Sequence, residues 1–365
     1  MKFKYFTHSI LSDWNNGNAH FLRGVASELL FRGHEVIFYE PSDGWSLSKL
    51  KQYYGAAALN GFHEVYPTLK SHLYNLESID LENELDSADV VIVHEWNAPQ
   101  IISVIGDIRK RKNSFKLFFH DTHHRAVSNP EDIAVMELAN YDGVLAFGET
   151  LKNLYLQKGW VKQAWTWHEA ADIRVFKPID FEGPKDDLVW IGNWGDEERS
   201  SELEEYIFDP VRELHLNCNV YGVRYPQDAL ETLKKSDISY RGWLPNYKVP
   251  QVFSQSQLTV HVPRRPYVRM LPGIPTIRIF EALACGIPLI SSQWDDCEGL
   301  LTEGKDYLMV YNGAMMKECI QTLLEDKSFA NELRNHGRNT ILQKHTCAHR
   351  VDQLLEICNG LKKEN

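Results

Sequence analysis

The chain has 365 residues, of which 43% are hydrophobic and 24% are charged, and its formal net charge is -11. This length suffices for two domains with separate cores, and the apolar content is that of an ordinary globular protein. The acidic balance disfavours a sequence-independent nucleic-acid binder, which needs a basic surface, although it leaves room for a local basic groove.

Strands and helices are predicted to alternate along the first half of the chain. Strands are expected at residues 4–7, 35–39, 89–94, 115–120, 143–147 and 165–169. Helices are expected at residues 20–32, 100–111, 131–139 and 151–158. Such alternation is typical of a parallel, doubly wound sheet with helices on its faces.

A stretch rich in Pro, Gly and charge, residues 175–187, predicts a linker before a second alternating run. That run has expected strands at 188–191, 218–221, 258–262, 287–290 and 307–310, with helices at 202–213, 228–235, 314–325 and 329–345. Residues 348–361 form an amphipathic helical pattern. We therefore expect an α/β fold with a first domain over 1–180, a second over 181–345 and a C-terminal helix over 346–365 that could cross back to the first domain.

The segment 272–292 combines a helix start, an acidic residue and a buried strand. Thr276 can cap the helix, whose first backbone N–H groups then suit a phosphate or pyrophosphate. Glu281 lies one and a half turns later, where a carboxylate could hold ribose hydroxyls. The alternative is an ordinary helix–strand joint in which Glu281 is solvated.

Polar side chains gather after the predicted strands, at the ends where open α/β sheets bind ligands. In the first half they are Asp13, Asn15, Asn16, Asn18, His20, His94, Glu95, Asn97, His120, Asp121, His123, His124 and Arg125. In the second half they are Gly192, Asn193, Arg199, Arg264, Arg265, Arg269 and the run from Thr276 to Glu281. The first set suits proton transfer and the second suits phosphates.

Four short motifs occur in a set order along nearly the whole chain. They are residues 16–20 with 29–36, residues 167–178, residues 189–193 and residues 281–290. Together they resemble motifs of the GT-B glycosyltransferases, particularly the glycosyl transferases group 1 and their CgeB (YkvP)-like branch. The resemblance implies two Rossmann-like domains facing across a cleft, with a nucleotide-sugar donor on the second.

The resemblance also implies roles for individual residues on the donor side. Glu281 would take the ribose hydroxyls, and Thr276 with Ile277 would face the pyrophosphate. Arg278 would be a donor ligand or a structural partner of Glu281. The remaining donor-binding candidates are Arg264, Arg265, Gly192, Asn193, Gly17 and Asn18. Arg264 and Arg265 follow a strand directly and could clamp a diphosphate, or they could form a surface pair with neighbouring acids.

Three residues are candidates for the chemical step. His120 stands where relatives carry a histidine near the donor sugar, Asp121 could act as a base in an inverting enzyme, and His20 is the rival base. The resemblance favours retention. One departure is Gly273, which stands eight positions before Glu281, where the family often has a second glutamate.

These observations predict transfer of a sugar from a nucleotide-diphosphate donor to an acceptor hydroxyl on a glycan, small molecule or surface component. The alternatives are a nucleotide-sugar 2-epimerase of the same fold and a non-catalytic sugar-nucleotide-binding protein of a surface-layer pathway. No Asp-x-Asp stands where a sugar-nucleotide metal would be expected, so we predict no metal and no cofactor beyond the donor. The charge disfavours nucleic acid as the acceptor without excluding it, and membrane association stays open.

The compartment is inferred from cysteine usage and from the N-terminus. The six cysteines are scattered and include no C-x-x-C pair, which argues against a zinc site or a disulfide framework. The N-terminus runs straight into a predicted strand without the apolar core of a signal peptide, and no apolar stretch reaches transmembrane length. We therefore expect a cytoplasmic protein.

Overall fold

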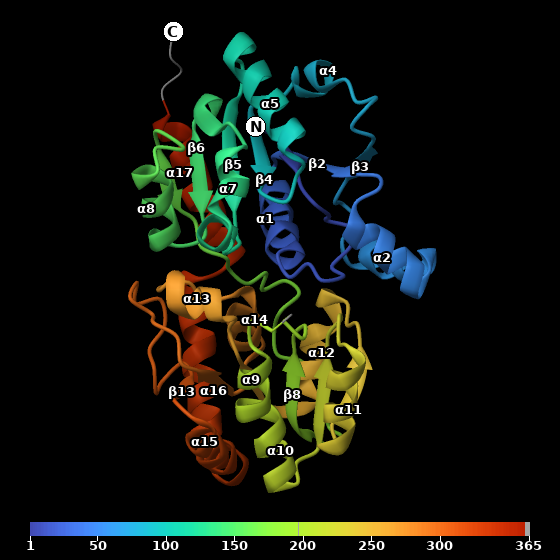
Figure 1. Ribbon diagram of the computed structural model, residues 1–365, viewed down its shortest axis with the longest axis vertical. Helices are drawn as coiled ribbons and strands as arrows, with labels where there is room; N and C mark the ends of the chain where they lie inside the picture. Colours follow the sequence, from blue (N-terminus) through green and yellow to red (C-terminus); the bar gives the residue numbers. More distant parts are fainter. Residues whose placement is uncertain (196, 362–365) are drawn as a thin grey trace. The chain divides into compact units, whose positions relative to one another are not determined.

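The computed structural model describes residues 1–195 and 197–361, which form two compact α/β units (Figure 1). The first unit combines Met1–Glu169 with the described residues from Cys347 onward, and the second is Ala170–Thr346. The last four residues of the C-terminal helix predicted over 346–365 lie outside the described part of the chain. Each unit is built around one parallel sheet, so the predicted α/β class with two Rossmann-like domains is confirmed.

The first unit contains a seven-stranded sheet in the order β3-β2-β1-β4-β5-β6-β7, and all its pairings are parallel. Its strands are β1 (Lys2–Phe6), β2 (Glu35–Pro41), β3 (Ser71–Tyr74), β4 (Val90–His94), β5 (Lys116–Asp121), β6 (Gly143–Ala146) and β7 (Ala164–Thr166). The central strand β4 is buried along its whole length, as helices on both faces of a parallel sheet require. Parallel pairing brings the carboxyl ends of all these strands to the same end of the sheet.

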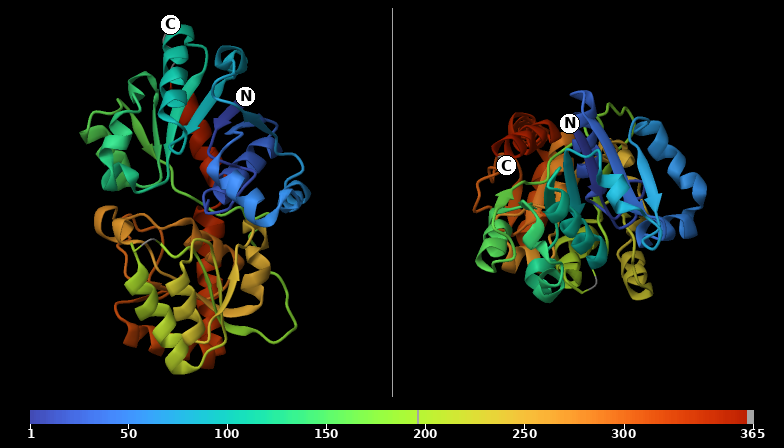
Figure 2. Two further views of the ribbon diagram at one scale, coloured as in Figure 1. Left: turned by 45° about the vertical axis from the view of Figure 1, so that its right-hand side comes forward. Right: turned by 90° about the horizontal axis from the view of Figure 1, so that it is seen from above.

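Helices of the first unit cover its sheet, and the last of them comes from the C-terminus. They are α1 (Ala19–Phe31), α2 (Trp45–Tyr54), η1 (Ala56–Leu59), α3 (Asn60–Val65), α4 (Leu81–Leu85), α5 (Pro99–Lys112), α6 (Arg125–Ser128), α7 (Pro130–Ala134), η2 (Leu138–Asn140), α8 (Glu149–Gln157) and α17 (Cys347–Gly360). Helix α17, drawn in red, packs against α1 (Figure 2). The Trp167 indole donates a 2.8 Å hydrogen bond to the Arg350 carbonyl, which helps to hold α17 in this unit.

The second unit contains a six-stranded parallel sheet in the order β10-β9-β8-β11-β12-β13. Its strands are β8 (Asp186–Ile191), β9 (Cys218–Tyr221), β10 (Ser239–Gly242), β11 (Ser256–His261), β12 (Leu289–Ser292) and β13 (Leu308–Val310). Its helices are α9 (Ser200–Leu203), η3 (Glu204–Phe208), α10 (Asp209–Leu214), α11 (Gln227–Lys235), η4 (Asn246–Lys248), α12 (Val249–Ser254), α13 (Arg265–Met270), α14 (Ile277–Cys285), α15 (Gly313–Glu325) and α16 (Lys327–Lys344).

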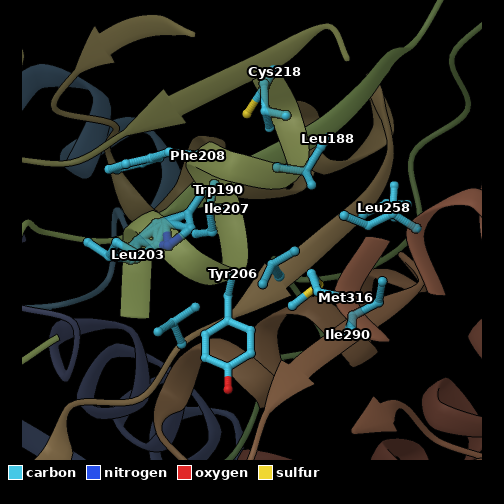
Figure 3. Close-up of a cluster of buried hydrophobic side chains, with 14 of the residues drawn as sticks. Leu188, Trp190, Leu203, Tyr206, Ile207, Phe208, Cys218, Leu258, Ile290 and Met316 are labelled. Carbon is cyan, nitrogen blue, oxygen red and sulfur yellow. The ribbon is translucent and has the colours of Figure 1, made fainter. Parts of the chain in front are cut away.

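Two hydrophobic clusters hold the second unit together. In the cluster of Figure 3, Leu188 and Trp190 of β8 meet Leu258 of β11 and the side chains of η3. Fully burying a leucine such as Leu258 contributes about 1.5–3 kcal/mol. A second cluster contains Phe280 and Leu283, so it fixes α14 against the sheet and with it the position of Glu281.

The structure corrects the sequence prediction at two helices. The helix predicted over 131–139 is interrupted because Glu137 adopts a left-handed backbone conformation with φ 51° between α7 and η2. The helix predicted over 202–213 contains a π-helical segment, η3, shortly before Pro210, which has no N–H to donate within a helix. In the described part of the chain, no helix has both the length and the apolar character to cross a membrane.

Candidate functional site

A buried polar network lies at the carboxyl ends of β4 and β5 in the first unit. The Nδ1 atom of His94 is 3.0 Å from Oε2 of Glu95, and both residues are buried. The backbone N–H and the hydroxyl of Thr122 each donate to Oε1 of Glu95 at 3.3 Å. Strands β4 and β5 pair His94 with His120, so the parallel register creates this network from residues far apart in the sequence.

Burial shifts the pKa values of His94 and Glu95 in opposite directions, and both shifts favour the neutral form of the group. It lowers the pKa of His94 to about 3, with help from the Arg125 charge, and raises the pKa of Glu95 to about 8 against the opposing effect of Arg125. A neutral imidazole beside a protonated carboxyl costs less in an apolar environment than two charges. Near neutral pH Glu95 can therefore hold a proton while His94 stays neutral.

His120 is fully buried, and neither of its ring nitrogens has a hydrogen-bond partner among the described residues. Its ring packs against Trp167 and Phe21 at centroid distances of 4.9 and 5.9 Å, and burial lowers its pKa well below the ordinary value. A neutral histidine with two unengaged nitrogens could serve a ligand hydroxyl as a donor and an acceptor.

Asp121 is equally buried but is already hydrogen-bonded within its own unit. The Tyr155 hydroxyl donates to Oδ2 at 2.6 Å and the His123 backbone N–H donates to Oδ1 at 3.0 Å. Burial, followed by the nearby Glu95, raises the pKa of Asp121 to about 7. This value is suited to a general base, and the two donors hold the carboxyl group in one orientation.

The other first-unit candidates lie around the start of α1. His20 is fully buried in the first turn, and Gly17 is exposed in the preceding loop. Asn18 holds the N-cap position without capping the helix. Its Nδ2 instead lies 2.5 Å from Nε2 of His94, so Asn18 joins the buried network.

A row of aromatic rings borders the network. His8 stacks on Trp45 at 4.8 Å, Trp45 meets Trp14 edge-on at 5.6 Å, and Trp14 stacks on Tyr53 at 6.0 Å. Trp96 lies under the guanidinium of Arg125 at 4.6 Å. Trp45 and Trp96 are each 39% exposed, so parts of these rings stay available for stacking.

In the second unit Glu281 lies on α14 and is fully buried. Its Oε2 pairs with the Arg278 guanidinium one turn earlier, and its Oε1 accepts from the Asn246 amide at 3.4 Å. Arg278 is thus the structural partner of Glu281 that the sequence offered as one alternative. Asn246 was not anticipated, because no sequence pattern marks the short η4 that carries it.

Thr276 is the N-cap residue of α14, but its side chain does not cap the helix. Its hydroxyl lies 3.1 Å from Nε2 of His261, whose Nδ1 is 2.9 Å from the Ser291 hydroxyl. Ile277 is buried as the first residue of the helix. The start of α14 thus lacks a side-chain cap, and His261 is a further polar residue that its place at the end of an apolar strand could have revealed.

Arg264 and Arg265 are both engaged by acidic residues near α9. Arg264 lies 2.7 Å from Glu198 and Arg265 lies 2.6 Å from Glu202. Arg199 behaves differently, because it donates to the carbonyls of Val262 at 2.9 Å and Asn193 at 2.6 Å. Burial, followed by the charge of Arg264, lowers the pKa of Arg199 to about 9.

Gly192 and Asn193 form a tight loop after β8. A Cβ added to Gly192 would lie 2.0 Å from the Trp190 ring, so only glycine fits there without a shift. Oδ1 of Asn193 accepts from the Val223 backbone at 2.9 Å. Both residues therefore shape the backbone after β8.

Gly273 adopts φ +86°, which favours glycine, and its N–H donates to the Asp295 carbonyl at 2.6 Å. A Cβ added here would lie 2.9 Å from both Cys297 and the Glu298 side chain. A glutamate therefore could not enter this position without rearrangement of the neighbouring side chains or backbone.

The structure thus places Asn18 in the network of His94 and Glu95, and it places His120 and Asp121 beside that network at the end of β5. Thr276, Ile277, Arg278 and Glu281 lie together at the start of α14. Arg264 and Arg265 instead form ion pairs with Glu198 and Glu202. Among the described residues, no group of three or more His, Cys, Asp or Glu side chains is arranged to hold a metal ion.

Comparison with protein families gives one match. Residues 199–356 match the family model described as glycosyl transferase-like, a range that includes α14 and Glu281. No curated protein sequence matches the chain.

Solved structures match over almost the whole chain. Anabaena Alr3699/HepE in complex with UDP and glucose has a TM-score of 0.70 at 13% identity, covering 99% of this chain and 100% of that one. A glycosyltransferase from Rickettsia africae ESF-5 has a TM-score of 0.67 at 12% identity, covering 98% and 97%. An alpha-glucosyltransferase in complex with UDP and a 13-mer DNA has a TM-score of 0.71 at 12% identity, covering 98% and 99%.

The fold is that of the GT-B glycosyltransferases. The glycosyl transferase-like model covers less than half of the chain, and the structural neighbours share its two Rossmann-like domains. At these identities the structural likeness concerns the fold, so the roles of individual residues rest on the geometry described above.

Proposed function

We propose that this protein is a glycosyltransferase that moves a sugar from a UDP-sugar to an acceptor hydroxyl. The observation that carries the proposal is the buried Glu281 beside the uncapped start of α14, inside the segment that matches the glycosyl transferase-like model. A helix N-terminus attracts a diphosphate, and a carboxylate one turn away can accept from ribose hydroxyls. The choice of UDP is supported by the neighbours crystallised with UDP and with glucose.

In this proposal the first unit supplies the groups for chemistry. The neutral His120 contacts the donor sugar or its leaving phosphate. Retention is favoured by the family resemblance, and Tyr155 and His123 hold the Asp121 carboxyl group with one hydrogen bond to each oxygen. The four sequence motifs support the CgeB-like branch.

The acceptor is proposed to be a saccharide. Support comes from the half-exposed rings of Trp45 and Trp96, since aromatic faces with a polar edge suit sugar rings. The transfer is proposed to need no metal, because the helix start and the basic groups of the second unit can offset the charge of the leaving diphosphate.

The test combines donor binding with turnover. We expect UDP and one UDP-sugar to bind in calorimetry, UDP to be released with a saccharide acceptor, and EDTA to leave the rate unchanged. Glu281→Ala should weaken UDP binding about tenfold or more, as loss of a charged hydrogen-bond acceptor predicts. Glu325→Ala, at an exposed position on α15, is the matched control.

Other outcomes would favour the alternatives. Binding without release of UDP for any acceptor would favour the non-catalytic sugar-nucleotide-binding protein, for which Gly273 is the supporting observation. Conversion of the donor to its 2-epimer without an acceptor would identify an epimerase. Unchanged UDP affinity in Glu281→Ala would remove Glu281 from the donor site.

A further inference from the structure

A cavity of about 260 Å³ lies at the amino ends of strands in the second unit. Its wall includes Ser256, the first residue of β11, and Pro288, which precedes β12. Gly286, at the C-terminal end of α14, also lines it. Since α14 has nine residues, about 13 Å of helix separates this cavity from Thr276 at the other end. The cavity is thus distinct from the candidate donor site.

Three basic residues line this cavity, namely Lys185, Lys327 and Arg334. No acidic residue among those described lines it, and none forms an ion pair with any of the three. Two acids are adjacent to these cations in the chain, and both have other partners. Asp326 caps α16 by accepting from the Phe329 N–H at 2.9 Å, and Asp186 accepts from the Asn219 amide at 2.6 Å. Lys327 donates instead to the neutral side chain of Gln257.

The side chains of Lys185 and Lys327 are exposed and that of Arg334 is half-buried, so solvent offsets only part of the repulsion among the three charges. Burial lowers the pKa of Lys185, and the charges of Arg334 and Lys327 lower it further, because the three cations repel one another. The chain has 50 acidic against 39 basic residues, so acids to neutralise such a cluster are abundant. The C-terminus of α14 favours one nearby cation, Arg334, whose Nε is 3.9 Å from the Cβ position of Gly286. The C-terminus of α14 does not account for the presence of all three cations.

We infer that this cavity binds a small phosphate-bearing metabolite. A phosphate group would neutralise the three cations through charge-assisted hydrogen bonds. Apolar walls from Ile179, Phe253 and Leu323 would hold the rest of the molecule. The volume is slightly below the usual range of ligand pockets, about 300–1,000 Å³, so the ligand is closer in size to a sugar phosphate than to a nucleotide.

The test uses the full chain with UDP present at saturation, so that the proposed donor site is filled. Inorganic phosphate and glucose 6-phosphate are titrated by calorimetry, and vesicles containing phosphatidylglycerol serve as a membrane probe. We expect saturable binding of one soluble probe and at least a tenfold weaker affinity in the double variant Lys327→Gln/Arg334→Gln. Lys234→Gln/Lys235→Gln on α11 removes the same charge outside the cavity and should bind normally.

Three outcomes would overturn the inference. They are an absence of saturable binding by either soluble probe, an equal loss of affinity in both double variants, and binding to the vesicles alone. The inference is independent of the proposed transferase activity. Should UDP fail to bind while glucose 6-phosphate binding is lost only in Lys327→Gln/Arg334→Gln, the donor proposal fails and the second site stands.

Discussion

The carboxyl ends of the two parallel sheets carry opposite kinds of polar chemistry. In the first unit, burial moves the pKa of His94 down to about 3 and that of Glu95 up to about 8, so the groups become neutral. In the second unit the charges form pairs, as Arg278 does with Glu281 and Arg264 with Glu198. Desolvation penalises a lone charge, and a protein can respond by neutralising it or by pairing it. At these positions the first end therefore holds neutral polar groups and the second holds paired charges.

The largest effect is expected at His120. If the neutral network of the first unit performs the chemistry, His120→Gln should lower kcat about 10²–10⁴-fold, the range typical of acid–base and hydrogen-bonding groups at a reaction centre. UDP affinity should fall far less than kcat, because Glu281 and the start of α14, which the proposal assigns to UDP, lie in the second unit. The measurement is UDP release under saturating donor, with His72→Gln on the exposed part of β3 as control. Full activity in His120→Gln would remove this residue from the reaction.

A smaller effect, on stability, should separate the arginines of the second unit. Arg199→Met leaves the carbonyls of Val262 and Asn193 without their donor and should cost about 2–4 kcal/mol. Arg265→Met breaks a partly exposed pair with Glu202 and should cost about 0–1 kcal/mol. Urea denaturation of both variants measures the difference. Equal losses of unfolding free energy in the two variants would show that the two arginines contribute equally to stability.

A substitution at Gly273 tests whether the second unit could accommodate the glutamate that the family often has at this position. Gly273→Ala introduces a Cβ at positive φ and 2.9 Å from Cys297 and Glu298, so it should destabilise the protein by about 1–3 kcal/mol. Gly299 also has positive φ but no atom within 4 Å of its Cβ position, so Gly299→Ala isolates the backbone cost. If urea denaturation shows equal losses of stability for Gly273→Ala and Gly299→Ala, the contacts around Gly273 add no cost to that of the backbone.

The smallest expected effect is on the dependence of Tm on pH. Glu95 has a folded pKa of about 8 against about 4.3 in the unfolded chain, so the stability it contributes is complete below about pH 4.3 and is lost as pH rises through about 8. His94 acts in the opposite direction, since its contribution is complete above about pH 6.5 and is lost as pH falls through about 3. Glu95→Gln should therefore reduce the fall in Tm between pH 6 and 9 by roughly 2–4 °C.

The control for this pH measurement is Glu64→Gln, at an exposed position on α3. It should leave the slope of Tm against pH as in the parent protein. A slope that is equally steep in Glu95→Gln would assign the alkaline loss of stability to other groups.

Much of the fold could be predicted from local patterns. The expected strand at 218–221 coincides with β9, and the helices expected at 20–32 and 314–325 differ by a residue from α1 and α15. The region 44–85 gave no readable pattern, and it forms the short elements α2 to α4 and the edge strand β3. Short elements at a sheet edge carry little periodicity of their own, because packing against the rest of the unit decides their conformation.

The candidate site was predictable in its positions but not in its partners. The rule that ligands bind beyond the carboxyl ends of parallel strands located His120 and Asp121 from the sequence. It could not indicate that Tyr155 and His123 already occupy the oxygens of Asp121 or that Thr276 contacts His261. The contacts of Tyr155 with Asp121 and of His261 with Thr276 join separate elements and depend on register and packing, whereas His123 lies two residues from Asp121 and its contact depends on the path of the chain after β5.

The sequence by itself determined the parallel α/β class and the helix start before Glu281, because apolar runs and helical spacing act over a few neighbouring positions. Only the tertiary structure decided which charges meet. It leads Arg264 to Glu198 and Arg265 to Glu202, and it brings Lys185, Lys327 and Arg334 together without an acid. Pairing and desolvation depend on distances through space, and a linear sequence does not contain those distances.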